Sequence, residues 1–217
     1  MEKRRDSATA YIILADGFET IEALTPLDVL RRCGVEVTTI SLNQTRAVRS
    51  SHGVTVEADA TMEEYMLKRS NAGSSSSADN AGSSSSAGSS TTASSTVRQA
   101  LILPGGYPGY KNLCDSPEVG ALITQFHKEG KLLCAICGAP TALKANQICR
   151  GAAITCHTSV KEELSDYYSI LSSAVVKYMN IITGMGAGRS LEFAFAIAEA
   201  LTSKEKVEEI KAKMEII

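Results

Sequence analysis

Residues 132–140 read LLCAICGAP, and the rest of the chain is best interpreted from this stretch outward. Leu132–Ile136 is a short, mostly apolar run that predicts a buried strand ending in a sharp turn at Cys137 and Gly138. Pro140 then opens the segment TALKAN, which predicts a helix. Cys137 is therefore expected where a strand meets a helix, beside backbone N–H groups and the positive end of the helix dipole.

A thiol at such a corner can be a nucleophile or a packing residue. The N–H groups that open a helix favour an anion and can lower a thiol pKa from about 8.5 by several units, which gives a reactive thiolate at neutral pH. A buried cysteine otherwise acts as a small hydrophobic side chain. The spacing of this one motif leaves both interpretations of Cys137 open.

The composition is that of a globular protein and excludes several classes of function. The 217 residues suffice for one α/β domain, and 44% are hydrophobic and 21% charged. A net charge of -2 gives no electrostatic footprint for nucleic acid or an anionic membrane. No apolar run approaches the length of a membrane span, and YIILA near the start is too short for a signal peptide. We expect a cytoplasmic protein, with the nucleus as a second location, and neither membrane nor direct nucleic-acid binding.

The six cysteines are expected to be reduced thiols, because several lie in apolar strand or helix patterns. Cys134 and Cys137 form a C-x-x-C motif, but Cys134 falls inside the predicted strand rather than at a helix start. Three histidines and no second cysteine pair give a zinc site little support. We therefore expect no metal and no cofactor.

Apolar strands alternate with amphipathic helices along the chain. This alternation predicts right-handed βαβ units and a mainly parallel sheet that is covered on both faces. Strands are expected at 10–15, 35–42, 98–106, 132–136, 152–157, 173–180 and 181–188, with a small hairpin at 47–59. Helices are expected at 18–34, 61–69, 117–130, 141–146, 159–168, 190–201 and 203–214, and no element is assigned to 107–116.

Residues 70–96 differ abruptly from the rest in composition. NAGSSSSAD is followed by the near repeat NAGSSSSAG, and the block holds no large apolar residue that could offset the entropy of ordering. We expect a disordered insertion, either tolerated at the surface or used for phosphorylation or tethering. The prediction is thus a single domain over 8–217 that this insertion interrupts.

Residues that could bind a ligand or take part in catalysis follow several of the predicted strands. Ligands gather at the carboxyl ends of parallel strands. Asp16, Gly105–Gly106, Cys137, His157 and Gly184–Gly186 all lie at such positions. This coincidence favours the reactive interpretation of Cys137.

Five segments in order carry a resemblance to the ThiJ/PfpI superfamily, within it to the branch of the Parkinson-disease-associated deglycase. They are ADGFETIEALTPLDVLRRCGVEVT, ALILPGG, LLCAICGAPTAL, TCHT and GMGAGRSLEFA. The resemblance covers nearly the whole chain apart from the Ser-rich block and the extreme N-terminus. It implies a flavodoxin-like three-layer α/β/α sandwich that is usually a homodimer.

The resemblance implies three catalytic side chains. Cys137 matches the family nucleophile, Glu22 the carboxyl group that contacts the thiol, and His157 the histidine at a strand end. A protonated carboxyl group can donate a hydrogen bond to a thiolate, and an imidazole can shuttle protons near neutral pH. Without the resemblance, the sequence favours an early-helix carboxylate over catalysis for Glu22 and a satisfied polar residue over a base for His157. Glu19, on another helix face, is expected to be a solvated charge.

The resemblance also implies a backbone site for an oxyanion. Gly105 and Gly106 match the family's Gly-Gly pair, and the N–H groups of Gly106 and Gly138 could stabilise a developing negative charge. Taken alone, the Gly-Gly pair marks only a turn.

Two of the places where the chain departs from the resembling branch lie after His157 and in the last predicted strand. Thr158 stands where close members carry proline. Met185 stands where they carry arginine, and the following turn reads GAG over 186–188 in place of GPG. Arg189 is the candidate replacement for the absent arginine.

Two functions follow from the resemblance, and both use the same thiol. The first is a cofactor-free glyoxalase or deglycase that acts on reactive dicarbonyls such as methylglyoxal or on their adducts. The second is a redox sensor and stress-response chaperone in which Cys137 oxidises to a sulfinate. His157 separates them, because aldehyde turnover needs a proton shuttle and sulfinate formation does not. A cysteine peptidase is disfavoured because Gly138, not histidine, follows Cys137.

Overall fold

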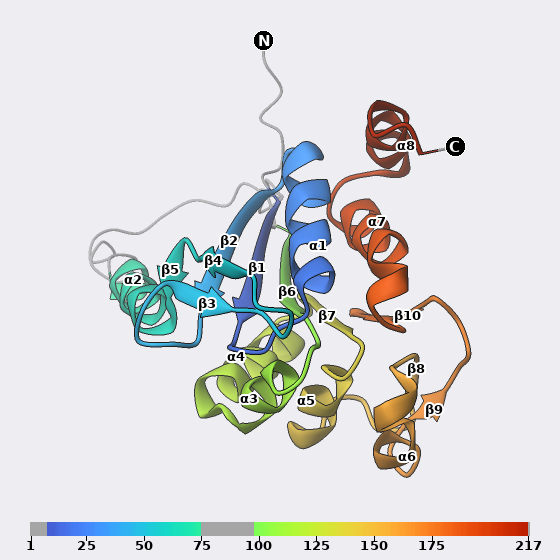
Figure 1. Ribbon diagram of the computed structural model, residues 1–217, viewed down its shortest axis with the longest axis horizontal. Coiled ribbons are helices and arrows are strands. Elements are labelled where there is room, and N and C mark those ends of the chain that lie inside the picture. The colour runs from blue at the N-terminus through green and yellow to red at the C-terminus, as the bar shows by residue number, and fades with distance from the viewer. Residues whose placement is uncertain (1–7, 75–97, 217) are drawn as a thin grey trace, which may run out of the picture.

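The computed structural model describes residues 8–74 and 98–216 and contains a seven-stranded sheet between two layers of helices (Figure 1). The strand order is β10-β11-β7-β6-β1-β2-β5, and every neighbouring pair is parallel except β10 and β11. The strands are β1 (Thr9–Leu14), β2 (Glu36–Ser41), β5 (Ala60–Thr61), β6 (Gln99–Leu103), β7 (Leu132–Ile136), β10 (Val175–Tyr178) and β11 (Ile181–Gly184).

Helices cover both faces of this sheet, so the predicted flavodoxin-like three-layer sandwich is confirmed. Helices α1 and α7 lie side by side on one face, with α8 beyond them, and α2 to α6 pack on the other (Figure 1). No helix of the described residues is long and apolar enough to cross a membrane. The helices are α1 (Thr20–Arg32), α2 (Met62–Ser74), α3 (Gly109–Asp115), α4 (Pro117–Lys128), α5 (Pro140–Ala145), α6 (Lys161–Leu164), α7 (Ser190–Leu201), α8 (Lys204–Lys213) and the 3₁₀ helices η1 (Thr158–Val160) and η2 (Ala187–Arg189).

Strand β1 shows why the sheet is buried on both sides. Successive side chains of a strand point to opposite faces. Ala10, Ile12 and Leu14 pack in the core shared with α1, α7 and α8, whereas Ile13 packs in the core beneath α3, α4 and α5. Both faces of the strand are covered, so its sequence reads as a nearly continuous apolar run.

The predicted hairpin forms and lies against the end of β1. Strands β3 (Ala47–Arg49) and β4 (Thr55–Glu57) pair antiparallel in a separate two-stranded sheet. Their connecting turn is joined to the loop after β1 by a bridge between Phe18 and Ser50 and by a bond from Ser51 N to Phe18 O of 2.9 Å. The hairpin turn is thereby brought to the carboxyl ends of the main strands.

The strand predicted at 152–157 is wrong in length and in partner. Only β8 (Ala153–Ile154) forms, and it pairs with β9 (Ser169–Ile170) outside the main sheet. The residues that follow β8 make isolated hydrogen bonds instead of the regular hydrogen-bond ladder of paired strands. Thr155 N donates to Thr183 Oγ1 at 2.9 Å, and the backbone N–H of His157 donates to Cys137 O at 2.9 Å.

Three other expectations also need correction. The helix predicted at 159–168 is replaced by η1 and the four-residue α6, because the chain turns at Ser165 to reach β9. Helix α3 forms within 107–116, where its Gly- and Pro-rich start concealed it. Helix α2 continues to Ser74, so the Ser-rich block does not begin as a loop at Ser70. The remainder of the expected insertion, 75–96, lies outside the described residues.

Replacing Phe126 by alanine tests the core beneath α4. Phe126 is 1% exposed and packs edge-on against Tyr11 at a centroid distance of 6.1 Å. Because Phe126→Ala leaves a cavity there, we expect the free energy of unfolding to fall by about 3–5 kcal/mol. The exposed Lys128 of the same helix provides the control, and Lys128→Ala should change it by less than about 0.5 kcal/mol. Urea unfolding measures both values, and equal losses would contradict this account.

Candidate active site

A cavity of about 610 Å³ opens where β1, β6, β7 and β11 end. This edge of a parallel sheet is where the sequence predicts a ligand site. The cavity brings together the three predicted catalytic side chains, which come from segments far apart in the chain. It is lined by Glu19, Glu22, Ser51, His52, Gly106, Tyr107, Cys137, His157, Met185, Gly186, Ala187, Gly188 and Arg189.

Cys137 lies at the corner between β7 and α5. Its backbone has a positive φ of 66°, which an L-residue adopts only where surrounding contacts hold it. One such contact is the bond from Cys137 N to Gly184 O at 3.0 Å, which ties the corner to β11. The thiol is half-buried and free, whereas Cys134 is wholly buried within β7. The two cysteines of the C-x-x-C motif are therefore not a joint redox pair.

Glu22 is completely buried and lines the same cavity. It lies in the first turn of α1, and its Oε2 accepts a hydrogen bond from Gly105 N at 2.8 Å. Its Oε1 has no nitrogen or oxygen partner among the described residues. The Cys137 thiol lies beside this carboxyl group, because a Cβ on Gly105 would lie 2.6 Å from Glu22 Oε2 and 3.0 Å from Cys137 Sγ. An uncompensated buried carboxylate is costly, so its environment favours a protonated or proton-sharing state.

Two positions of the site require glycine, because neighbouring atoms lie too close to the backbone to leave room for a side chain. A Cβ on Gly105 would lie 2.6 Å from both Cys137 Cβ and Glu22 Oε2. Gly106 has a φ of 90°, and its Cβ would lie 2.5 Å from the carbonyl carbon of Phe18. The expected oxyanion residues thus stand beside the thiol because no side chain separates them from it.

The pKa of the Cys137 thiol, which lies beside Glu22, differs from the value expected from the sequence. Burial raises the pKa of the Cys137 thiol to about 12, and the charge of Glu22 adds to this rise. Bonds from the N–H groups of Gly106 and Gly138 lower the pKa but do not outweigh burial. The expected helix-lowered pKa is therefore wrong for the resting site. Helix α5 has only six residues, and the thiol faces a carboxyl group.

The carboxyl group of the pair titrates near neutral pH. Burial raises the pKa of Glu22 from 4.5 to about 7, while bonds from Cys137 and Gly105 lower it to a smaller extent. A base with a pKa near the working pH is well matched to proton transfer. Glu22 can therefore accept the proton of the adjacent thiol when that thiol attacks a substrate.

His157 lines the cavity from the segment after β8. Ser159 N donates to His157 Nδ1 at 3.2 Å, and Ser159 Oγ lies 2.8 Å from the same nitrogen. Because Nδ1 accepts this bond, the neutral imidazole carries its proton on Nε2. The bond from the His157 backbone to Cys137 O fixes the histidine segment to the corner that holds Cys137. The predicted strand-end position is replaced by the N-cap of η1.

The cavity also contains residues that the sequence interpretation missed. Glu19 is not a solvated charge, because its side chain is only 15% exposed and its Oε2 caps α1 through Glu22 N at 2.9 Å. His52, from the β3–β4 turn, lies 3.8 Å from Glu19 Oε1 and was not singled out. Arg189 lies at the end of η2 and was named only as a substitute for an absent arginine. The fold alone brings the hairpin turn to this edge.

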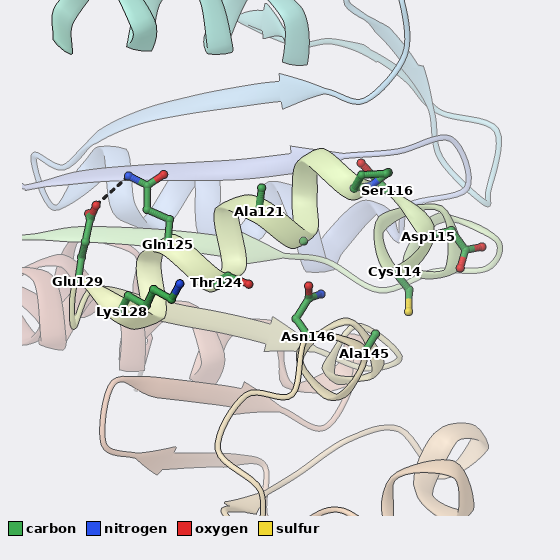
Figure 2. Close-up of a pocket in the computed structure, with 12 residues that line it drawn as sticks. Cys114, Asp115, Ser116, Ala121, Thr124, Gln125, Lys128, Glu129, Ala145 and Asn146 are labelled. Carbon is green, nitrogen blue, oxygen red and sulfur yellow. Dashed lines mark hydrogen bonds between the residues drawn. The ribbon is translucent and has the colours of Figure 1, made fainter.

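A second cavity, of about 690 Å³, lies among α3, α4 and α5 (Figure 2). None of the predicted site residues lines it. Its wall is close-packed at one point, since a Cβ on Gly120 would lie 2.7 Å from Asn146 Oδ1.

Among the described residues, no cluster of three or more His, Cys, Asp or Glu side chains could hold a metal ion.

The raised pKa of Glu22 predicts a pH-dependent stability. Between its unfolded value of 4.5 and its folded value of about 7, the folded state binds more protons, so stability falls as pH rises. From below pH 4.5 to above pH 7, the Glu22→Gln variant should gain roughly 3 kcal/mol relative to wild type. Urea unfolding at a series of pH values measures this difference.

The exposed Glu36 at the start of β2 provides the matched control. Glu36→Gln should leave the pH profile of wild type unchanged. If the wild-type and Glu22→Gln profiles ran parallel over this range, the buried carboxyl group would not have a raised pKa.

Comparisons with known proteins agree with this fold. A model of the DJ-1/PfpI family matches residues 8–200. Protein dj-1beta of Drosophila melanogaster is 34% identical over 205 residues, which cover 94% of this chain and 95% of that protein. The crystal structure of Drosophila melanogaster DJ-1beta superimposes with a TM-score of 0.79 at 32% identity, covering 97% of this chain and 99% of that one.

A third relative carries an enzyme name. Glutathione-independent glyoxalase DJR-1.2 of Caenorhabditis elegans is 39% identical over 107 residues, which cover 49% of this chain and 56% of that protein. The family model and the fly relative each extend over most of the present chain. The chain belongs to the DJ-1/PfpI family.

Proposed function

We propose that this protein is a cofactor-independent glyoxalase that converts small dicarbonyls to hydroxy acids through the thiolate of Cys137, and that it also removes dicarbonyl adducts as a deglycase. The observation that carries the proposal is the convergence of Cys137, Glu22 and His157 on one cavity. The similarity to a glutathione-independent glyoxalase over about half of the chain supports it. The expected homodimer and cytoplasmic location remain predictions.

The first step is the addition of the thiol to the aldehyde carbon. Glu22 accepts the thiol proton as the carbon–sulfur bond forms, so the thiolate exists in the transition state without a low resting pKa. The aldehyde oxygen becomes the oxyanion of a hemithioacetal and accepts hydrogen bonds from the N–H groups of Gly106 and Gly138. Glu22 then returns the proton to this oxygen and is again a carboxylate.

The second step moves a proton between the two carbons. Glu22 removes the proton from the former aldehyde carbon, and the Nε2–H of His157 stabilises the neighbouring oxygen of the enediol. Reprotonation at the second carbon gives a thioester, which water hydrolyses to the hydroxy acid and the free thiol. The net reaction adds one water to methylglyoxal to give lactate, so it needs neither oxidant nor reductant. Hydrolysis of an early adduct on a thiol or amine uses the same nucleophile.

Substitution of the nucleophile and the histidine tests the proposal. Without glutathione, wild type should consume methylglyoxal and release lactate. Cys137→Ala should abolish the reaction, and His157→Ala should lower kcat by about 10²- to 10⁴-fold because a general acid is lost. Lactate measured by an enantiomer-specific dehydrogenase gives both rate and product.

Two matched controls use the same residue types outside the cavity. Cys149→Ala and His127→Gln should keep wild-type rates. Turnover by Cys137→Ala, or an inert wild type, would refute the glyoxalase proposal.

A redox sensor is the second candidate, and the groups around one thiol favour it. Cys114, Cys137 and Cys149 are half-buried and the other cysteines are buried, but Cys137 is the one that lines the cavity beside Glu22. A sulfinate at Cys137 would be held by the N–H groups of Gly106 and Gly138. Because these donors stabilise the oxidised anion and Glu22 can accept the thiol proton, mild peroxide should add two oxygens to Cys137 before any other cysteine, measured by peptide mass spectrometry. Oxidation spread evenly over the six cysteines would exclude this role.

A further inference from the structure

The segment after β11 forms a basic wall of the cavity. Residues 185–189 all line it, and the basic side chain among them is Arg189. The acidic side chains of the cavity, Glu19 and Glu22, come from the start of α1. The basic and the acidic side chains of the cavity therefore come from different elements of the fold.

Arg189 has donors available for a ligand. Its Nη1 bonds Glu192 Oε1 at 3.0 Å, which uses one of the five N–H donors of a guanidinium group. Its side chain is 54% exposed, so it reaches the solvent-filled part of the cavity. A planar guanidinium is suited to bind a carboxylate through paired bonds.

The acidic groups of the cavity make contacts of their own at the start of α1, and Arg189 is not among their partners. Glu19 Oε2 caps α1 through Glu22 N at 2.9 Å, and Glu19 Oε1 lies 3.8 Å from His52 Nδ1. Glu22 accepts a bond from Gly105 N and faces the thiol. The volume of about 610 Å³ is also that of a cavity for a ligand much larger than a three-carbon dicarbonyl.

We propose that the substrate is a dicarbonyl whose far end carries a carboxylate, and that the guanidinium group of Arg189 binds this carboxylate. The inference rests on the proposed glyoxalase function for its substrate class. The aldehyde end lies at Cys137 and the anionic end at the basic wall. Arg189 is a binding residue here and moves no proton.

Alkylation of Cys137 tests the basic wall without requiring turnover. Iodoacetate and iodoacetamide both transfer a two-carbon group to sulfur with loss of iodide, and they differ in that only iodoacetate carries a carboxylate. The ratio of the iodoacetate rate to the iodoacetamide rate should fall about five- to tenfold in Arg189→Gln, because one charged contact is lost. Arg189→Lys should retain part of the preference. Peptide mass spectrometry follows both rates.

Arg32 of α1 provides the matched control. It is exposed to a similar degree, at 47%, and pairs with Asp28 at 2.8 Å within its own helix, as Arg189 pairs with Glu192. Arg32→Gln should leave the ratio unchanged. An unchanged ratio in Arg189→Gln would overturn the inference whether or not the protein turns over any dicarbonyl.

Measuring the turnover of two dicarbonyls is the second test of the inference. A ketoaldehyde ending in a carboxylate, dioxopentanoate, is compared with its methyl ester. Wild type should show a kcat/KM about five- to tenfold higher for the acid, and Arg189→Gln should lose this preference through KM with kcat retained. Equal values for acid and ester in wild type would overturn the inference. Failure to turn over either compound, with the alkylation preference intact, would instead refute the glyoxalase proposal and leave an anion-binding wall beside the thiol.

Discussion

The buried contact between the Glu22 carboxyl group and the Cys137 thiol is the constraint on which the rest of the site depends. Both groups lose solvation, so a single proton between them is more stable than two charges. Gly105 must be glycine because its Cβ would occupy the space where the two groups meet. The positive φ of Cys137, the cap of α1 and the end of β6 all serve to hold this one contact.

This contact changes how the nucleophile works. A thiol activated by a helix N-terminus would be ionised before substrate arrives, whereas burial raises the pKa of Cys137 to about 12. In the proposed reaction the carboxyl group, with a pKa of about 7, accepts the proton only as attack proceeds. A site that works in this way would keep the thiolate rare until the proposed aldehyde is bound.

Much of the fold was predictable from the sequence because its strands are short apolar runs between turn residues. The stretch 132–140 indicated strand, corner and helix correctly, and Cys137 could be identified from it. The segment 152–157 misled because its side chains are apolar while its backbone bonds go to Thr183 Oγ1 and Cys137 O, a tertiary feature with no local pattern. Helix α3 was concealed by the glycine and prolines that precede it.

The candidate site was only partly predictable, for a related reason. Glu22, Cys137 and His157 belong to motifs that can be recognised in order along the chain. Glu19 and His52 gain their position from the docking of the β3–β4 turn onto the loop after β1, which no periodicity in either segment reveals. The pKa directions depended on burial, which spacing does not report.

The chain that follows the Ser-rich block enters the sheet at the end far from Cys137 and Glu22. The rest of the block follows Ser74 of α2 and precedes β6, whose first residue, Gln99, pairs with Thr9 at the amino end of β1. The cavity lies beyond the opposite ends of the same strands. Arg98 anchors the re-entry point through a bond from Nη1 to Thr202 O at 2.8 Å. Chain length can therefore vary at this junction, by evolutionary expansion of a repeat or by fusion of a foreign domain, without reshaping the catalytic pocket.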